Sequence, residues 1–161
     1  MSLSAMRRFF LAPFLLLAMT ANAGNFFPPE YKQFPFKEGD LLVSTRADGK
    51  FAVNRVLAVD RFDFKKNAVI NIQGQDFSAS EDDHLLVVGA AYGENEFTSF
   101  EQARAAALAG KWTRKIRHAP NRAPGAAAGQ TLVGHQPVAA SELEGYRVWR
   151  AAFEKGEAGI F

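Results

Sequence analysis

The sequence predicts an α+β fold, either a curled antiparallel sheet or a small β-barrel, with two flanking α-helices. Short runs rich in β-branched and aromatic residues, separated by glycine and aspartate, occupy residues 41–90. Two segments with helical start and stop signals follow, between residues 98 and 156. The 161-residue chain contains no cysteine, so the fold must be held by a hydrophobic core and not by disulfides.

Residues 1–23 have the anatomy of a secretory signal peptide. Two arginines precede the apolar run Phe9–Met19, and the small-x-small triplet at 21–23 predicts cleavage before Gly24. The apolar run is much shorter than the roughly 20 residues that a membrane-spanning helix needs. We therefore expect an exported, periplasmic protein, without a membrane span after cleavage, whose mature part is one globular domain over residues 24–161.

Removal of the leader leaves the mature domain without net charge. The whole chain has 19 basic and 17 acidic side chains, and the two extra basic ones are Arg7 and Arg8. A globally basic nucleic-acid-binding protein is therefore excluded. The charges are still segregated, because residues 102–141 contain basic side chains and no acid. These either pair loosely with the acidic residues before them or form a single-sign surface that steers a charged partner.

The mature domain begins with an arm, residues 24–38, in which aromatic residues alternate with prolines. Proline fixes the backbone in extended conformations, so we expect neither a helix nor a central strand here. Exposed aromatic clusters are rare on monomers, which favours an arm that wraps its own domain and buries its rings. The alternative is an arm that binds a partner.

Residues 39–117 form the β-rich part, which includes one helix. Strands are predicted over 41–46 and 51–60, joined by a tight type I′ turn at Asp48-Gly49. Arg55 interrupts the apolar face of the second strand.

Two further strands are predicted over 68–73 and 84–90, which completes a four-stranded antiparallel meander. Another strand is expected over 112–117. Because neighbouring side chains of a strand alternate between its faces, that strand should separate Arg114 from Arg117.

Capping boxes mark the start of both helices. Thr98 and Glu101 form the first, and the alanine-rich helix that follows should stop at Gly110. Ser141 and Glu144 form the second, at the start of a C-terminal helix over 141–155. The stripe of that helix expected to pack on the core consists of Leu143, Tyr146, Trp149, Ala152 and Phe153.

Residues 118–140 separate the β-rich part from the last helix and show little periodicity. They contain three prolines, three glycines and a single charged residue. Loops of this length in compact domains are usually functional or disordered. We expect a packed, irregular loop, to which Thr131–Val133 adds a short edge strand.

The sequence shows no established catalytic or metal-binding motif. His84, His118 and His135 do not form the paired spacing of a zinc site, and neither a GxSxG elbow nor a phosphate loop is present. We therefore expect no metal, no cofactor and no enzyme activity. A hydrolase remains an alternative, with a carboxylate pair drawn from Asp82, Asp83, Glu94 and Glu96.

The hairpin sequence resembles a known class of proteins. Gly39–Val43, Gly49–Val53 and Arg55–Leu57 together are similar to the opening hairpin of small β-barrel immunity proteins, which are encoded beside bacterial toxins. The resemblance implies a non-catalytic protein that neutralises a secreted toxin, such as a lipase or cell-wall hydrolase, by covering its active site. The oligomeric state stays open.

The region around the long loop is the predicted partner-binding surface. Its residues are Arg114, Arg117, His118, Asn121, Arg122, Thr131 and His135. The alternative function is periplasmic binding of a small molecule or glycan in the curled sheet. The aromatic residues that would stack on such a ligand are Phe51, Phe62, Phe64, Tyr92 and Trp112.

Overall fold

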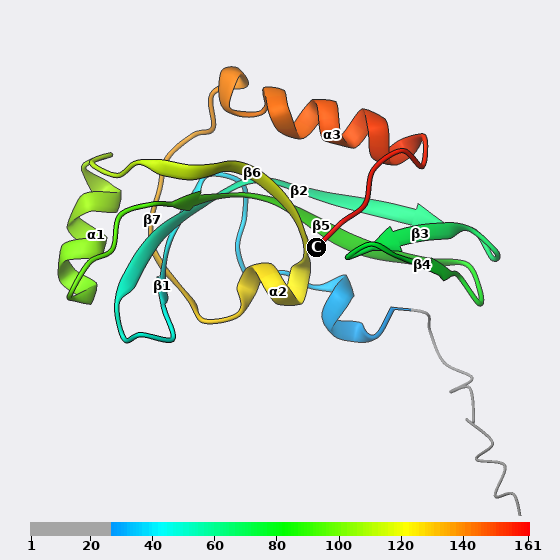
Figure 1. Cartoon of the computed structure of the whole chain (residues 1–161), viewed down its shortest axis with the longest axis horizontal. Helices are drawn as coiled ribbons and strands as arrows, with labels where there is room; N and C mark the ends of the chain where they lie inside the picture. Colours follow the sequence, from blue (N-terminus) through cyan, green and yellow to red (C-terminus); the bar gives the residue numbers. More distant parts are fainter. Residues whose placement is uncertain (1–26) are drawn as a thin grey trace, which may run out of the picture.

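The computed structural model describes residues 27–161 (Figure 1). The predicted signal peptide, residues 1–23, lies outside the described residues. The elements, in chain order, are η1 (Pro29–Lys32), β1 (Asp40–Thr45), β2 (Phe51–Phe64), β3 (Val69–Ile72), β4 (Gln75–Ser78), β5 (Asp83–Gly93), α1 (Phe100–Leu108), β6 (Arg114–Arg122), α2 (Ala123–Ala127), β7 (Gln130–His135), η2 (Ala140–Glu142) and α3 (Glu144–Glu154). In this part of the chain no helix has the length and apolar character needed to cross a membrane.

The predicted α+β class is confirmed. Five antiparallel strands form the main sheet in the order β6-β5-β2-β1-β7, and β3 and β4 form a separate two-stranded sheet. The two edge strands, β6 and β7, are not hydrogen-bonded to each other, so the described strands form no closed barrel. Three α-helices pack around this sheet where two were predicted.

The first predicted hairpin is present, but its turn differs. β1 and β2 pair from Leu41 opposite Arg55 to Thr45 opposite Phe51. Only Gly49, with φ at 78°, has positive φ in the connection, whereas a type I′ turn requires two such residues. The predicted type I′ turn is therefore wrong here.

The predicted four-stranded meander is also wrong. β2 continues to Phe64 and pairs directly with β5, so the segment predicted as the third strand does not lie between them. β3 instead forms a hairpin with β4, which the sequence interpretation missed. Its connecting residues, Gln73 and Gly74, both have positive φ, the backbone geometry that we expected in the first hairpin.

The long irregular loop expected over 118–140 does not exist. β6 extends to Arg122, α2 follows at once, and β7 occupies Gln130–His135. Pairing with β5 and with β1 supplies the backbone hydrogen bonds that local periodicity could not predict. The short edge strand expected at Thr131–Val133 is confirmed within the longer β7.

The predicted caps of both helices shift. The side chain of Ser99, and not of Thr98, accepts the N–H of Gln102 at the start of α1. No side chain caps α3 in the way expected of Ser141; the short helix η2 leads into it instead. Both helices nevertheless stop where predicted, because Gly110 and Gly156 have positive φ just beyond their last turns.

The arm packs against its own domain from Phe27 onward. Phe27 is buried in the cluster beneath α3, and Phe34 and Phe36 pack on the opposite face of the sheet. The arm includes the short helix η1, which the proline pattern did not predict.

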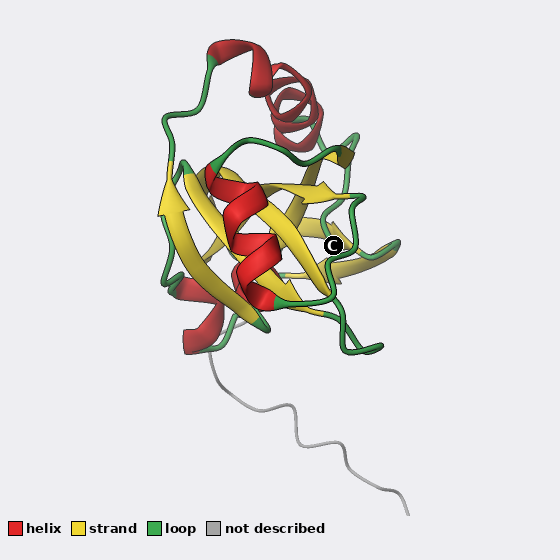
Figure 2. Cartoon of the chain, turned by 90° about the vertical axis from the view of Figure 1, so that its left-hand side faces the viewer, coloured by secondary structure: helices red, strands yellow, loops and turns green. Residues whose placement is uncertain are grey.

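One face of the main sheet carries both long helices (Figure 2). α1 packs Ala103 and Ala107 on residues of β1 and β2, and α3 packs its apolar stripe on β2 and β5. A bulge at Leu57 in β2 keeps Arg55 and Ala58 on this same face although their numbers differ in parity. Arg55 therefore lies between the α1 and α3 clusters. The opposite face is covered by α2 and the arm.

Candidate functional site

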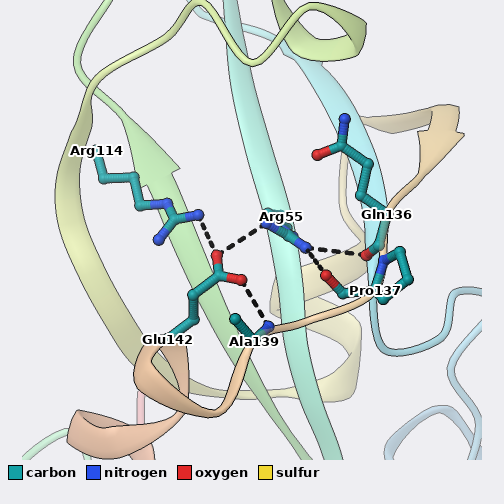
Figure 3. A network of polar contacts seen from close by, with 6 residues as sticks. All are labelled: Arg55, Arg114, Gln136, Pro137, Ala139 and Glu142. Atoms are coloured by element: carbon teal, nitrogen blue, oxygen red, sulfur yellow. Dashed lines mark hydrogen bonds and ion pairs between the residues drawn. The ribbon is translucent and has the colours of Figure 1, made fainter.

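An open groove of about 920 Å³ lies between the end of α1 and the beginning of α3. We call it the arginine groove. Its lining includes Arg55, Trp112, Arg114, Arg117, His118, Glu142, Glu144 and Gly145. Figure 3 shows the polar network at its centre.

Arg55 forms the buried part of the groove. Only 6% of the residue is exposed. Its Nη1 donates to Glu142 Oε1 at 2.8 Å, and its Nη2 donates to the carbonyls of Gln136 at 2.9 Å and Pro137 at 2.7 Å (Figure 3). The arginine thereby fastens the segment that connects β7 with α3 to the centre of the sheet. Its Nε has no hydrogen-bond partner within residues 27–161.

Glu142 is shared by two guanidinium groups. Its Oε1 also accepts from Arg114, and its Oε2 accepts the backbone N–H of Ala139 at 2.8 Å. Burial alone would raise the pKa of Glu142. The Ala139 N–H and the guanidinium groups of Arg114 and Arg55 outweigh this effect, so the pKa lies below its ordinary value. Glu142 is therefore an ionised carboxylate within the groove that accepts hydrogen bonds from three donors.

Two irregularities in β6 place several polar side chains in the groove. Between the pairs Gly93–Arg114 and Tyr92–Ile116, β5 advances by one residue and β6 by two. Between Tyr92–Ile116 and the pair Ala90–Ala119, β5 advances by two and β6 by three. Each extra residue interrupts the alternation of side chains.

As a consequence, Arg114, Arg117 and His118 all line the groove. The expectation that strand alternation separates Arg114 from Arg117 is wrong. Bulges often re-aim side chains in this way beside functional sites.

Arg117 and His118 retain unused donors or acceptors. Arg117 is exposed and has no ion-pair partner in the described part of the chain. His118 Nδ1 is buried without a hydrogen-bond partner among residues 27–161. The His118 ring lies so close to Gly145 that a Cβ there would collide with it, which explains the glycine in the first turn of α3.

The other predicted partner-binding residues lie elsewhere. Asn121 Nδ2 donates to the Ala119 carbonyl at 2.9 Å, and the Arg122 guanidinium lies 5.5 Å from the Tyr31 ring centroid. Thr131 is exposed on the edge strand β7, and His135 Nδ1 lies 3.0 Å from Asp40 Oδ1. None of these four lines the arginine groove.

The sequence interpretation missed two residues of the site, Arg55 and Glu142. A signal for Arg55 was present, because a charged residue interrupted an apolar strand face. Glu142 gave no such signal, since it lay within an apparently ordinary helix start.

Three of the four carboxylates considered for a hydrolase, Asp82, Asp83 and Glu96, are paired with lysines near the two ends of β5. Lys32 Nζ lies 2.7 Å from Asp83 Oδ1, and Lys65 Nζ donates to Asp82 Oδ2 at 2.7 Å. Lys50 Nζ donates to Glu96 Oε2 at 2.6 Å, and this bond lowers the pKa of Glu96. The bond from Lys65 likewise lowers the pKa of Asp82. A general acid needs the opposite shift, so these two residues do not provide one.

Of the five aromatic residues considered for ligand stacking, Trp112 lines the groove. Phe62 and Phe64 belong to the cluster beneath α3, and Phe51 packs near α1. Tyr92 is partly buried, and this burial raises its pKa. Within residues 27–161 no three His, Asp or Glu side chains are arranged to hold a metal ion.

Comparison of the chain with protein-family models, with curated proteins and with solved structures found no match. The function is therefore inferred from the geometry and chemistry of the arginine groove.

Proposed function

We propose that this protein is an exported, non-catalytic binding module that neutralises a secreted toxin in the periplasm by covering its active site. The observation that carries the proposal is the double bulge in β6, which turns Arg114, Arg117 and His118 into one open groove. The leader over residues 1–23 and the resemblance of the first hairpin to immunity proteins support the compartment and the class of partner.

The chemistry of the groove suits a protein interface. Arginine and tryptophan are enriched among residues that dominate binding energy, and Trp112 lies beside Arg114 here. A specific interface buries about 1,200–2,000 Å² in total, which is more than the groove provides. The exposed surfaces of β6 and α3 that border the groove would have to supply the rest of such an interface.

The proposed docking surface differs from the one that the sequence predicted. A protruding loop over 118–140 was expected to enter the partner's active site, but that segment is folded into β6, α2 and β7. The groove, bordered by β6 and the start of α3, takes its place. Arg114, Arg117 and His118 are retained from the predicted set.

Capture from periplasmic extract tests the proposal. The wild-type protein should retain a specific secreted protein, and the double variant Arg114→Glu/Arg117→Glu should lose it because an acidic partner is repelled. A matched control, Arg61→Glu/Lys66→Glu, makes the same change of charge away from the groove and should retain the partner. Loss in both variants, or recovery of no stable protein partner at native salt, contradicts the proposal.

A second candidate function is the binding of a small molecule or glycan. It is favoured by Trp112, whose ring lines a groove within the 300–1,000 Å³ range of ligand sites. A ligand of this kind should raise the melting temperature in proportion to the logarithm of its concentration. Unchanged melting temperatures across a glycan and lipid panel would exclude it.

A further inference from the structure

We propose that the arginine groove binds a carboxylate of the partner protein on Arg114 and Arg117, beside the internal carboxylate of Glu142. This inference rests on the proposed function and names the chemical group that anchors the partner.

The groove already holds a carboxylate that belongs to the protein itself. Glu142 shows which ligand the groove is built to hold, because two guanidinium groups and one backbone N–H converge on its two oxygens. Only 14% of this side chain is exposed, so it belongs to the wall of the groove and not to its mouth. A carboxylate that enters the groove from solvent would meet the guanidinium groups of Arg114 and Arg117.

Glu142 leaves several hydrogen-bond donors of the groove unused. Arg114 donates to Glu142 through Nη2, and its Nε and Nη1 make no hydrogen bond to the described residues. Arg117, the next cation along the groove, has no ion-pair partner within residues 27–161. The groove contains three guanidinium groups against the carboxylates of Glu142 and Glu144, which leaves it with a positive charge.

Arg114 is held in place before any ligand binds. Its guanidinium carbon lies 5.5 Å from the centroid of the Trp112 ring, and its Nη2 donates to Glu142. The planar guanidinium matches a carboxylate in a two-point contact, which a lysine cannot provide. Ordering a free arginine side chain costs binding free energy, and Arg114 avoids most of that cost.

Succinate tests the site directly, with succinamide as its uncharged equivalent. Titration followed by ¹H–¹⁵N spectra, including arginine Nε–H signals, should give saturable shifts of Arg114, Arg117 and Trp112 with succinate. Succinamide should give none. Arg117→Gln should weaken succinate binding about tenfold, the effect of one charge-assisted hydrogen bond. Arg61→Gln, the same change at an exposed arginine outside the groove, should leave it unaltered.

Several outcomes would overturn the inference. These are shifts that sodium chloride reproduces at equal ionic strength, equal binding of succinamide, or no effect of Arg117→Gln. Inorganic phosphate that binds more tightly than succinate would reject a carboxylate anchor in favour of a phosphate ligand. If succinate does not bind but the charge-reversed variant still loses its protein partner, this inference fails while the proposed function stands. If succinate binds but no protein is captured, the carboxylate site stands and the proposed function fails.

Discussion

Two neighbouring regions on the helix-bearing face of the sheet use opposite chemistry. Beneath α3, the ring centroids of Phe62 and Phe153 lie 4.9 Å apart, and those of Trp149 and Phe153 lie 5.0 Å apart. Beside it, the arginine groove is built from guanidinium groups around Glu142. Helix α3 contributes to both regions. Its buried stripe packs in the aromatic cluster, and its first turn borders the arginine groove. Stability and binding are thereby assigned to different parts of one element.

The energetic difference follows from solvation. Burying an aromatic side chain removes apolar surface from water, which stabilises the fold by about 2 kcal/mol or more. Burying an ion pair costs desolvation free energy that roughly cancels the attraction between the charges. The groove should therefore contribute little net stability, although removing Glu142 leaves Arg55 and Arg114 without their carboxylate partner.

The largest expected effect is the loss of a ring from the cluster. Phe153→Ala should lower the free energy of unfolding by about 4 kcal/mol, because it removes buried apolar surface and leaves a cavity. Val148→Ala is the control on the same helix, since Val148 is 69% exposed, and it should cost less than about 0.5 kcal/mol. Urea denaturation measures both. Similar losses for the two variants would contradict the distinction between the faces of α3.

The next largest effect concerns the buried arginine. Arg55→Met should cost about 3 kcal/mol, because it removes one of the three donors to the partly buried carboxylate of Glu142 and the side-chain donor to the carbonyls of Gln136 and Pro137. Glu142→Gln should then cost less in the Arg55→Met background than in the wild type, since part of its partnership is already lost. A double-mutant cycle by urea denaturation gives the coupling free energy. Strict additivity would show that the two side chains do not interact.

A substitution at the tight contact between β5 and α3 should cause a loss of stability of intermediate size. A Cβ on Gly89 would lie 2.5 Å from the Tyr146 ring, so Gly89→Ala should destabilise the protein by about 2 kcal/mol through overpacking. Gly125→Ala in α2 meets no atom within 4 Å and should be neutral or slightly stabilising. Thermal unfolding distinguishes them. A neutral Gly89→Ala would mean that α3 can shift away from the sheet.

The smallest expected effect is the pH dependence that Glu142 contributes. Its pKa is lowered in the folded protein, so its contribution is fully present above the pKa of the unfolded chain, about 4.3, and is lost as pH falls through the folded pKa. Glu142→Gln should reduce the loss of stability between pH 7 and pH 3 by about 1 kcal/mol. Denaturation at both pH values measures this. The other carboxylates are common to both proteins and cancel in the comparison.

The elements that the sequence predicted well are those specified by local signals. The first hairpin has its glycine turn, and α3 has apolar residues at helical steps, with Tyr146, Trp149 and Phe153 buried as expected. The failures concern long-range pairing. β2 pairs with β5 and not with the segment predicted as its neighbour, and the apparent loop 118–140 became two strands and a helix. Such pairing depends on partners distant in sequence, which periodicity does not register.

Only part of the candidate site could be predicted, because the site also depends on pairing between strands that are distant in sequence. Arg55 stood out as a charge on an apolar face, and Arg114, Arg117 and His118 stood out as part of a basic segment. Their convergence depends on two extra residues in β6 relative to β5, and a bulge exists only in the register between two strands.

The sequence alone determined the α+β class, the first hairpin, the two long helices and the presence of a basic segment. Local backbone preferences and apolar periodicity act over a few residues, and both can be read along the chain. The tertiary structure decided which strands are neighbours, where β6 bulges and which charges meet Glu142. These depend on packing between distant segments, and that packing is what turned separate basic residues into one groove.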